Sequence, residues 1–116
     1  MLSDIGSFWA PPLDLYETPS AFYLYIDLPG VALDDVEIVI EQLGVRLRGS
    51  RRSLSNGCSA ETLEIHTGTF DRELELPEKV DVSTASAVLK DGVLRIVLPK
   101  LEARAVAIHV QPEQES

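Results

Sequence analysis

The side chains that most often do chemistry are few in this sequence, and they form no catalytic pattern. The chain has one cysteine, Cys58, and two histidines, His66 and His109. Neither histidine has a metal-ligand spacing to the other or to the cysteine. Cys58 lies in a loop rich in serine and glycine with no nearby base, and the sequence has no phosphate-binding glycine loop. We therefore expect no enzyme activity, no metal site and no cofactor.

One arginine stands where an apolar residue would be expected. The segment from Phe70 to Leu76 alternates, which predicts a strand with Phe70, Arg72, Leu74 and Leu76 on one face. That face should be buried, and a buried arginine is costly unless it is paired. We expect Arg72 to meet a carboxylate or backbone carbonyls at a contact between subunits. An edge arginine with an exposed head group is the alternative.

The length and the charge of the chain limit the class of protein to which it can belong. A chain of 116 residues predicts one domain with a core of its own. A net charge of −9 disfavours surfaces for nucleic acid or for anionic membranes. No apolar run reaches the roughly 18 residues of a membrane span, and the first residues do not read as a signal peptide. We expect a cytoplasmic protein that binds neither nucleic acid nor membrane.

Short alternating runs separated by turn residues predict an all-β fold. Such runs cover residues 13–18, 21–28, 36–42, 45–52, 70–76 and 93–98. Pro29-Gly30 and Asp91-Gly92 are turn signals between them, and no segment predicts a long helix. This pattern is typical of an immunoglobulin-like β-sandwich, whose edge strands a protein must either cover or use.

Three motifs resemble the small heat shock proteins, the α-crystallin-domain family. They are Gly68-x-Phe70-x-Arg72-x-Leu74-x-Leu76-Pro77, Ala87-x-x-x-x-Gly92-Val93-Leu94 and Leu98-Pro99-Lys100, and an opening motif adds Asp14, Glu17 and the run Asp27-Leu28-Pro29-Gly30-Val31. The resemblance implies a short arm over residues 1–11, an α-crystallin domain over residues 12–100 and a C-terminal extension over residues 101–116.

The resemblance also implies how two chains pair. In bacterial and plant-type members, the long loop before the Gly-x-Phe motif carries a strand that crosses to the neighbouring subunit and pairs with its first strand. Here residues 59–63 would lie against residues 13–18 of the partner. The implied dimer interface consists of Arg72, Leu13, Leu15, Tyr16, Glu61 and Leu63.

The end of the chain resembles the mobile Ile-x-Ile anchor of this family. Ile108-His109-Val110 is the best register and Val106-Ala107-Ile108 is the rival, while a further strand of the same sandwich is the other interpretation. An extended segment can add to a sheet edge while its alternate apolar side chains fill pockets. The resemblance implies a groove for it, which also serves clients, lined by Val36, Ile38, Ile40, Ala87 and Leu89.

The function that the resemblance implies is that of an ATP-independent holdase of the stress response. Such a chaperone binds non-native client proteins and works as a homodimer that assembles into larger homo-oligomers. We expect Phe8 and Trp9 of the arm to dock on a neighbour or a client, with a frayed terminus as the alternative. Two other functions stay open, namely a p23-like co-chaperone that acts as a monomer and a β-sandwich binding module that is no chaperone.

Overall fold

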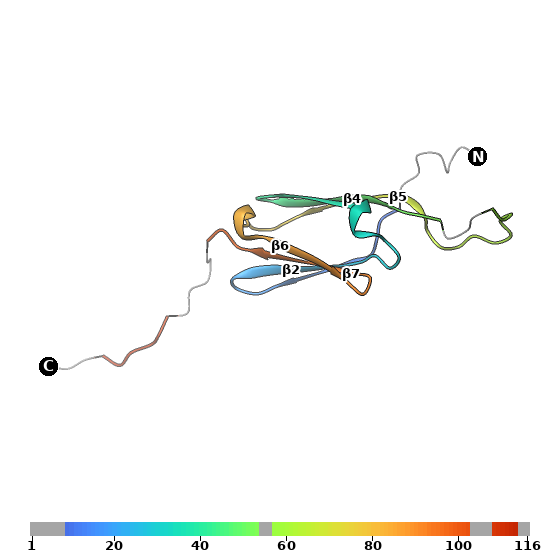
Figure 1. The fold of residues 1–116 in the computed structure, drawn as a ribbon. Helices are drawn as coiled ribbons and strands as arrows, with labels where there is room; N and C mark the ends of the chain where they lie inside the picture. The colour runs from blue at the N-terminus through green and yellow to red at the C-terminus, as the bar shows by residue number, and fades with distance from the viewer. Residues whose placement is uncertain (1–8, 54–56, 103–107, 114–116) are drawn as a thin grey trace.

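The computed structural model describes residues 9–53, 57–102 and 108–113, which form two antiparallel β-sheets packed face to face (Figure 1). One sheet has four strands in the order β1-β2-β7-β6, and the other has three in the order β3-β4-β5. The all-β sandwich predicted from the sequence is confirmed. The strands are β1 (Leu13–Glu17), β2 (Ala21–Asp27), β3 (Val36–Glu41), β4 (Gly44–Arg51), β5 (Gly68–Glu75), β6 (Ser86–Lys90) and β7 (Val93–Pro99).

The core lies between the two sheets and follows the alternation of the sequence. The central strands of the four-stranded sheet face each other in register, with Phe22 opposite Leu98 and Leu24 opposite Ile96. All four of these side chains are buried, and so is Phe70 from the other sheet. Each such side chain contributes about 1.5–3 kcal/mol to the free energy of folding when it leaves water. The central strands therefore form a stable core that supports the edge strands.

The hairpin between β6 and β7 has the turn that its sequence predicts. Asp91 and Gly92 both have positive φ angles, of 52° and 79°, as a two-residue type I′ turn requires. A second turn at Pro29 packs against it, because the Leu28 N–H donates to the Gly92 carbonyl at 2.7 Å. A Cβ on Gly92 would lie only 3.0 Å from the Pro29 Cα, so the close approach of the two turns also favours glycine there.

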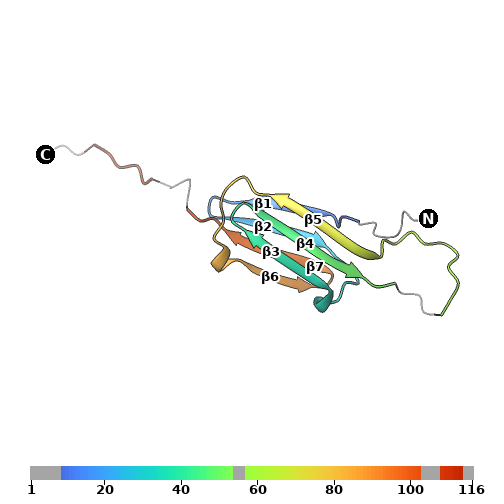
Figure 2. The same cartoon turned by 90° about the horizontal axis from the view of Figure 1, so that it is seen from above.

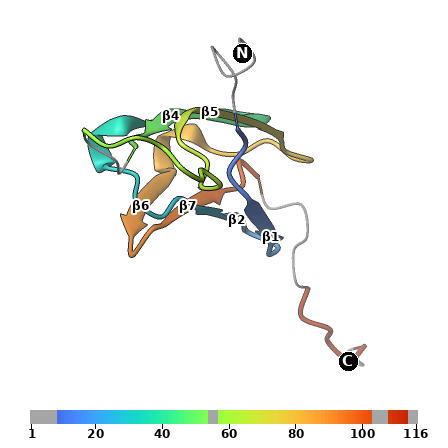
Figure 3. The same cartoon turned by 90° about the vertical axis from the view of Figure 1, so that its right-hand side faces the viewer.

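One side of the sandwich is closed by a short segment, residues 9–12, which we call the strap. Trp9 makes an isolated parallel bridge with Phe70 on β5, and the Pro12 carbonyl accepts a hydrogen bond from the Asp27 N–H. The strap therefore crosses from the β5 edge of one sheet to the β1 edge of the other (Figure 3). On the opposite side, β3 and β6 are the edge strands, and residues 28–35 and 76–85 cross between the sheets to reach them.

Several described segments belong to neither sheet, among them the 3-10 helices η2 (Leu33–Asp35) and η3 (Val82–Thr84). Residues 57–67 connect β4 to β5 without a strand, and they project beyond the end of the sandwich (Figure 2). Residues 108–113 are also outside both sheets. The described part of the chain contains no helix with the length and apolarity needed to cross a membrane.

Candidate functional site

Strand β1 lies at the outer edge of the four-stranded sheet. It pairs with β2 on one side only. Leu13 and Leu15 are half-buried against the core, while Tyr16 is exposed on the other face. The three β1 residues expected at a dimer interface therefore lie on a strand whose second edge has no partner strand in the described chain, and such an edge is a template for another strand.

The loop segment expected to pair with that edge is exposed in the single chain. Glu61 is exposed, and Leu63 has 76% of its surface in contact with solvent. The described loop residues form no ladder with β1 of their own chain. The structure thus does not bring the two halves of the expected interface together within one molecule. Their pairing between two molecules stays a prediction.

Arg72 occupies the place that its strand parity predicts. It lies opposite Leu47, a buried residue, so it shares the inward face of β5. Its guanidinium Nη1 donates to the Pro11 carbonyl at 3.1 Å, in a half-buried setting. The expectation that this arginine meets a backbone carbonyl is confirmed, although the carbonyl belongs to the strap of the same chain. Its place at a subunit contact stays a prediction.

Trp9 packs on the sandwich of its own chain, although the sequence analysis predicted that the arm reaches a neighbour or a client. Its N–H donates to the Thr69 carbonyl at 3.3 Å, and its indole Nε1 donates to the Gly68 carbonyl at the same distance. The Arg51 guanidinium lies 4.3 Å from its ring centroid, and the His66 ring stacks on it at 5.7 Å. These contacts tie the strap to the base of the long loop. Phe8 lies outside the described residues.

The predicted groove residues flank the open side of the sandwich. Val36, Ile38 and Ile40 on β3, and Leu89 on β6, are half-buried and pack against the core. Strands β3 and β6 are the edge strands on this side and run along it together (Figure 2).

Ala87 shows that this side is open. It pairs with Ile96, which is fully buried, so the Ala87 side chain points inward as well. It is nevertheless exposed. A small inward-pointing residue that remains exposed indicates an opening between the two edges. The occupancy of this opening by an anchor or a client stays a prediction.

The expected anchor residues are free of both sheets. Ile108 and Val110 are 81% and 86% exposed, and the described residues 108–113 form no strand. The interpretation of this segment as a further strand of the same sandwich is therefore wrong for the register that includes Ile108 and Val110. Val106, the start of the rival register, lies outside the described residues.

Lys100, directly after β7, has a buried side chain that forms ion pairs with two glutamates, and the sequence analysis missed this cluster. Its side chain is 4% exposed, and its Nζ lies 2.6 Å from Glu17 Oε2 and 3.4 Å from Glu78 Oε1. The same nitrogen lies 5.2 Å from the Phe22 ring centroid. The hydrogen bond to Glu17 is the main cause that raises the pKa of Lys100. This cluster fixes the end of β7 to the end of β1.

The residues with the most reactive side chains are not gathered anywhere in the described chain. Cys58 is exposed in the long loop. Within residues 9–53, 57–102 and 108–113, no three His, Cys, Asp or Glu side chains are grouped so that they could hold a metal ion. The structure has open strand edges and exposed apolar side chains, and both features are suited to binding other polypeptides.

Comparison with known proteins agrees with this geometry. The sequence model of the Hsp20/alpha crystallin family matches residues 14–111. The chain is 34% identical over 104 residues to a probable 15 kDa heat shock protein of Leptospira interrogans, covering 90% of this chain and 80% of that one. It is 32% identical over 104 residues to a 17.7 kDa class II heat shock protein of Arabidopsis thaliana, covering 86% and 67%.

Solved structures show the same architecture. The hspA structure from Xanthomonas axonopodis has a TM-score of 0.74 at 32% identity, covering 84% of this chain and 99% of that one. A small heat-shock protein from Xylella fastidiosa, described as having a distinct high order structure, has a TM-score of 0.73 at 30% identity, covering 93% and 100%.

Proposed function

The chain belongs to the Hsp20/alpha crystallin family, and from this we propose that it is an ATP-independent holdase that binds non-native proteins and limits their aggregation. Members of this family are non-enzymatic chaperones, so the chain is not an enzyme. A holdase keeps an unfolded chain soluble by binding it and leaves refolding to other factors. We also assign it to the cytoplasm as part of this proposal.

The observation that carries the proposal is the exposed apolar surface at the edges of a firm sandwich. Branched apolar side chains are exposed on segments outside both sheets, namely Leu63, Ile65, Ile108 and Val110. Non-native polypeptides expose apolar segments and unpaired backbone, and both kinds of group can add to open strand edges. The same apolar surface can therefore join copies of the chain when they are assembled and bind clients when they are apart.

We propose that the dimer forms by strand exchange at β1. Residues 59–63 of the long loop would add to the open edge of β1 in a second copy, and Leu63 would be covered there. Arg72 supports this edge because its bond to the Pro11 carbonyl holds the strap directly before β1. The two leucines of β1 are already fixed against the core, so the edge is preorganised for a partner strand.

Arg72→Gly tests this part of the proposal. We expect weaker dimers, because the strap loses its hydrogen bond at Pro11 and the start of β1 becomes less well fixed. The dimer dissociation constant from analytical ultracentrifugation is the measurement. Arg95→Gly, which removes an exposed arginine from β7, is the matched control and should leave the dissociation constant unchanged. An unchanged value in the Arg72 variant would contradict the role given to this residue.

We propose that dimers assemble through the end of the chain. Ile108 and Val110 would enter the opening between β3 and β6 of a neighbour, where Ala87 leaves space and Ile38 and Ile40 offer apolar walls. Two exposed apolar residues two positions apart point to the same side of an extended segment. This feature favours an assembling chaperone over a p23-like monomer.

The direct test of the function is protection of a client from aggregation. A thermally unfolding model enzyme is mixed with the full chain at equimolar ratio, and light scattering is followed with and without ATP. We expect suppressed scattering that is the same in both conditions. Serum albumin at the same mass concentration controls for crowding. Client scattering that matches the albumin sample would contradict the holdase function.

A further inference from the structure

The outer face of the four-stranded sheet carries a cluster of which only Tyr16 is expected at the dimer interface. Asp14 lies opposite Tyr25, and Tyr16 lies opposite Tyr23, so all four side chains project from the same face of β1 and β2. The rings of Tyr16 and Tyr25 are 5.8 Å apart at an interplanar angle of 77°. We call these four residues the tyrosine face.

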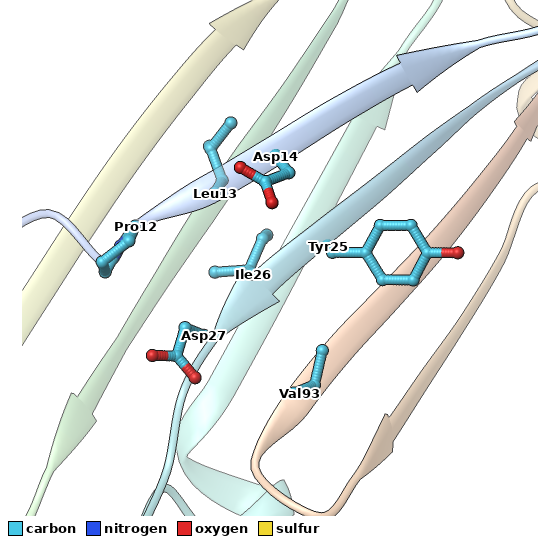
Figure 4. Close-up of a pocket in the computed structure, with 7 residues that line it drawn as sticks. All are labelled: Pro12, Leu13, Asp14, Tyr25, Ile26, Asp27 and Val93. Carbon is cyan, nitrogen blue, oxygen red and sulfur yellow. The ribbon is translucent and has the colours of Figure 1, made fainter.

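The tyrosine face is hollowed. A shallow hollow of about 560 Å³, largely open to solvent, is lined by Asp14, Tyr16, Tyr23 and Tyr25. A second hollow of about 210 Å³ shares Asp14 and Tyr25 and adds Asp27, further along β2 (Figure 4). The two hollows together present three aromatic rings and two carboxylates to solvent.

The chemistry of this surface suits a cation. No lysine, arginine or histidine lines either hollow, and Asp14 and Asp27 have no ion pair with another described residue. The faces of tyrosine rings attract ammonium and guanidinium groups, and nearby carboxylates add a charge-assisted hydrogen bond. An anion would meet two negative charges here, in a chain whose net charge is already −9.

The other outer face of the sandwich is different. On the three-stranded sheet, Arg46 forms an ion pair with Asp71 at 2.8 Å and Arg48 lies 3.9 Å from the same carboxylate, so this face carries cations of its own chain. Its hollow of about 480 Å³ is lined by both arginines and by glutamates such as Glu37 and Glu73. The two arginines in this lining would repel a basic side chain at close range. The tyrosine face differs because its two hollows combine aromatic rings with carboxylates and have no lysine or arginine in their lining.

We propose that the tyrosine face binds an arginine or lysine side chain of an extended client segment. This inference rests on the proposed function and names the kind of client sequence that the chaperone prefers, namely segments in which a basic residue stands among apolar ones. The negative net charge of the chain would also speed the approach of basic segments over longer distances.

The segments of the chain outside the sandwich are a poor source of this cation. Residues 1–8 and 53–67 contain no lysine or arginine, and residues 101–116 contain only Arg104. Arg52, at the start of the long loop, is paired with Asp35 at 2.9 Å. A partner strand added to the β1 edge would extend the sheet sideways, which leaves the outer face open. A client segment is thus a better occupant than a second copy.

Arg95 allows a test of whether the group bound at the tyrosine face is positively or negatively charged. It lies opposite Tyr25 on β7 and is exposed, but it lines neither hollow. As the neighbouring cation, it should weaken the binding of a basic side chain. Arg95→Gln should therefore raise the affinity for a basic peptide, whereas a site for anions would lose affinity in the same variant.

The test uses two short blocked peptides of glycine and serine, one with a central pair of arginines and one with citrullines in their place. Citrulline keeps the shape and removes the charge. Binding to the full chain is measured by calorimetry, and the tyrosine ring signals are followed by NMR. We expect the arginine peptide to bind about tenfold more tightly, which one or two cation–π contacts would give. The double variant Asp14→Asn/Asp27→Asn should lose this difference.

The control variant carries the same change of charge on the other face. Glu37→Gln/Glu41→Gln lies on the outside of β3 and should keep the preference for the arginine peptide. Equal binding of the two peptides by the wild-type chain would overturn the inference. So would a preference that persists in the Asp14/Asp27 variant, or a lower affinity for the arginine peptide in Arg95→Gln.

The light-scattering assay on the same proteins separates this inference from the proposed function. If the wild-type chain suppresses client aggregation but does not distinguish the peptides, the inference is wrong and the holdase function stands. If it distinguishes the peptides through Asp14 and Asp27 but leaves aggregation unchanged, the site stands as a peptide-binding site and the holdase function is wrong.

Discussion

Single residues in this chain are constrained by partners that are far away in the sequence. Arg72 was expected from strand parity to need a partner, and a backbone carbonyl from the strap meets that need. Lys100 gave no such signal, since one of its two carboxylates, Glu17, is 83 residues away. The alternation along a strand predicts which side chains are buried. It does not predict which group from a distant part of the sequence contacts them.

Gly49 is the position where added volume should cost most. A Cβ there would lie 2.2 Å from the Asp35 carbonyl oxygen and 2.6 Å from the Phe70 ring. Phe70 is fully buried and cannot move away. We expect Gly49→Ala to lower the free energy of unfolding by about 1–3 kcal/mol, as overpacking of a core does. Urea denaturation measures it.

Gly44 provides the matched control for this substitution. It lies on the same strand, and a Cβ there would come no closer than 3.3 Å to its nearest neighbour, the Leu74 carbonyl oxygen. Gly44→Ala should therefore cost clearly less than Gly49→Ala. Equal unfolding free energies for the two variants would contradict the close packing of Phe70 over Gly49.

Asp71 should make stability depend on pH in the acid range. Arg46 donates to both of its carboxylate oxygens, at 2.8 and 3.3 Å, and this hydrogen bonding lowers the pKa of Asp71. A carboxyl with a depressed pKa in the folded state stabilises the fold above its unfolded pKa of about 4, and this contribution disappears as the pH falls through the folded pKa.

Asp71→Asn should therefore be less stable than the wild type near neutral pH, and the two should converge in acid. Denaturation curves at several pH values measure the difference. Arg46→Gln and the double variant complete a cycle that isolates the pair from other effects of each change. If the difference in the free energy of unfolding between the two proteins stays constant down to acid pH, the carboxylate charge of Asp71 is not its cause.

Elements of the fold differ in how well the sequence specifies them. The strands that contribute to the core alternate clearly, and the Asp91-Gly92 turn was recognisable. Strand β6 is mostly exposed and has no clear alternation, so only the hairpin signal and the family motif pointed to it. The segment Glu61–Ile65 alternates as a strand would, but it belongs to no sheet in the single chain, because a ladder needs a second strand.

The strap is an element that the sequence did not reveal. Trp9 was expected to reach outward, yet its backbone bridges to β5 and its ring meets Arg51 and His66. An aromatic residue before a Pro-Pro pair gives no indication of whether it packs on its own chain or on another. Only the position of the β5 edge, set by the whole sandwich, decides this.

Trp9→Ala should loosen the strap and destabilise the sandwich. The ring contact with Arg51 and the bond from Nε1 to the Gly68 carbonyl are lost, so we expect a loss of about 1–3 kcal/mol in urea denaturation. Trp9→Phe keeps a ring beside Arg51 and loses only the Nε1 bond, and it should cost less. An alanine variant as stable as the wild type would show that the strap contributes nothing to the fold.

The whole molecule has one closed side and one open side. The strap covers the side between β5 and β1, whereas the opening at Ala87 lies between β3 and β6 on the other. The apolar residues that could fill such an opening, Ile108 and Val110, are exposed in the same chain. The sequence predicted the residues of both parts, and their contact between copies stays a prediction.

The central claim is that the exposed ends and edges of this chain join its copies. Native mass spectrometry of the full chain and of a chain that ends at Lys100 tests it most directly. We expect the full chain to form assemblies larger than a dimer and the shortened chain to form dimers. Ile108→Asp/Val110→Asp in the full chain is the control for length and should also give dimers. Equal masses for all three proteins would contradict the anchor, and monomers throughout would contradict the strand exchange as well.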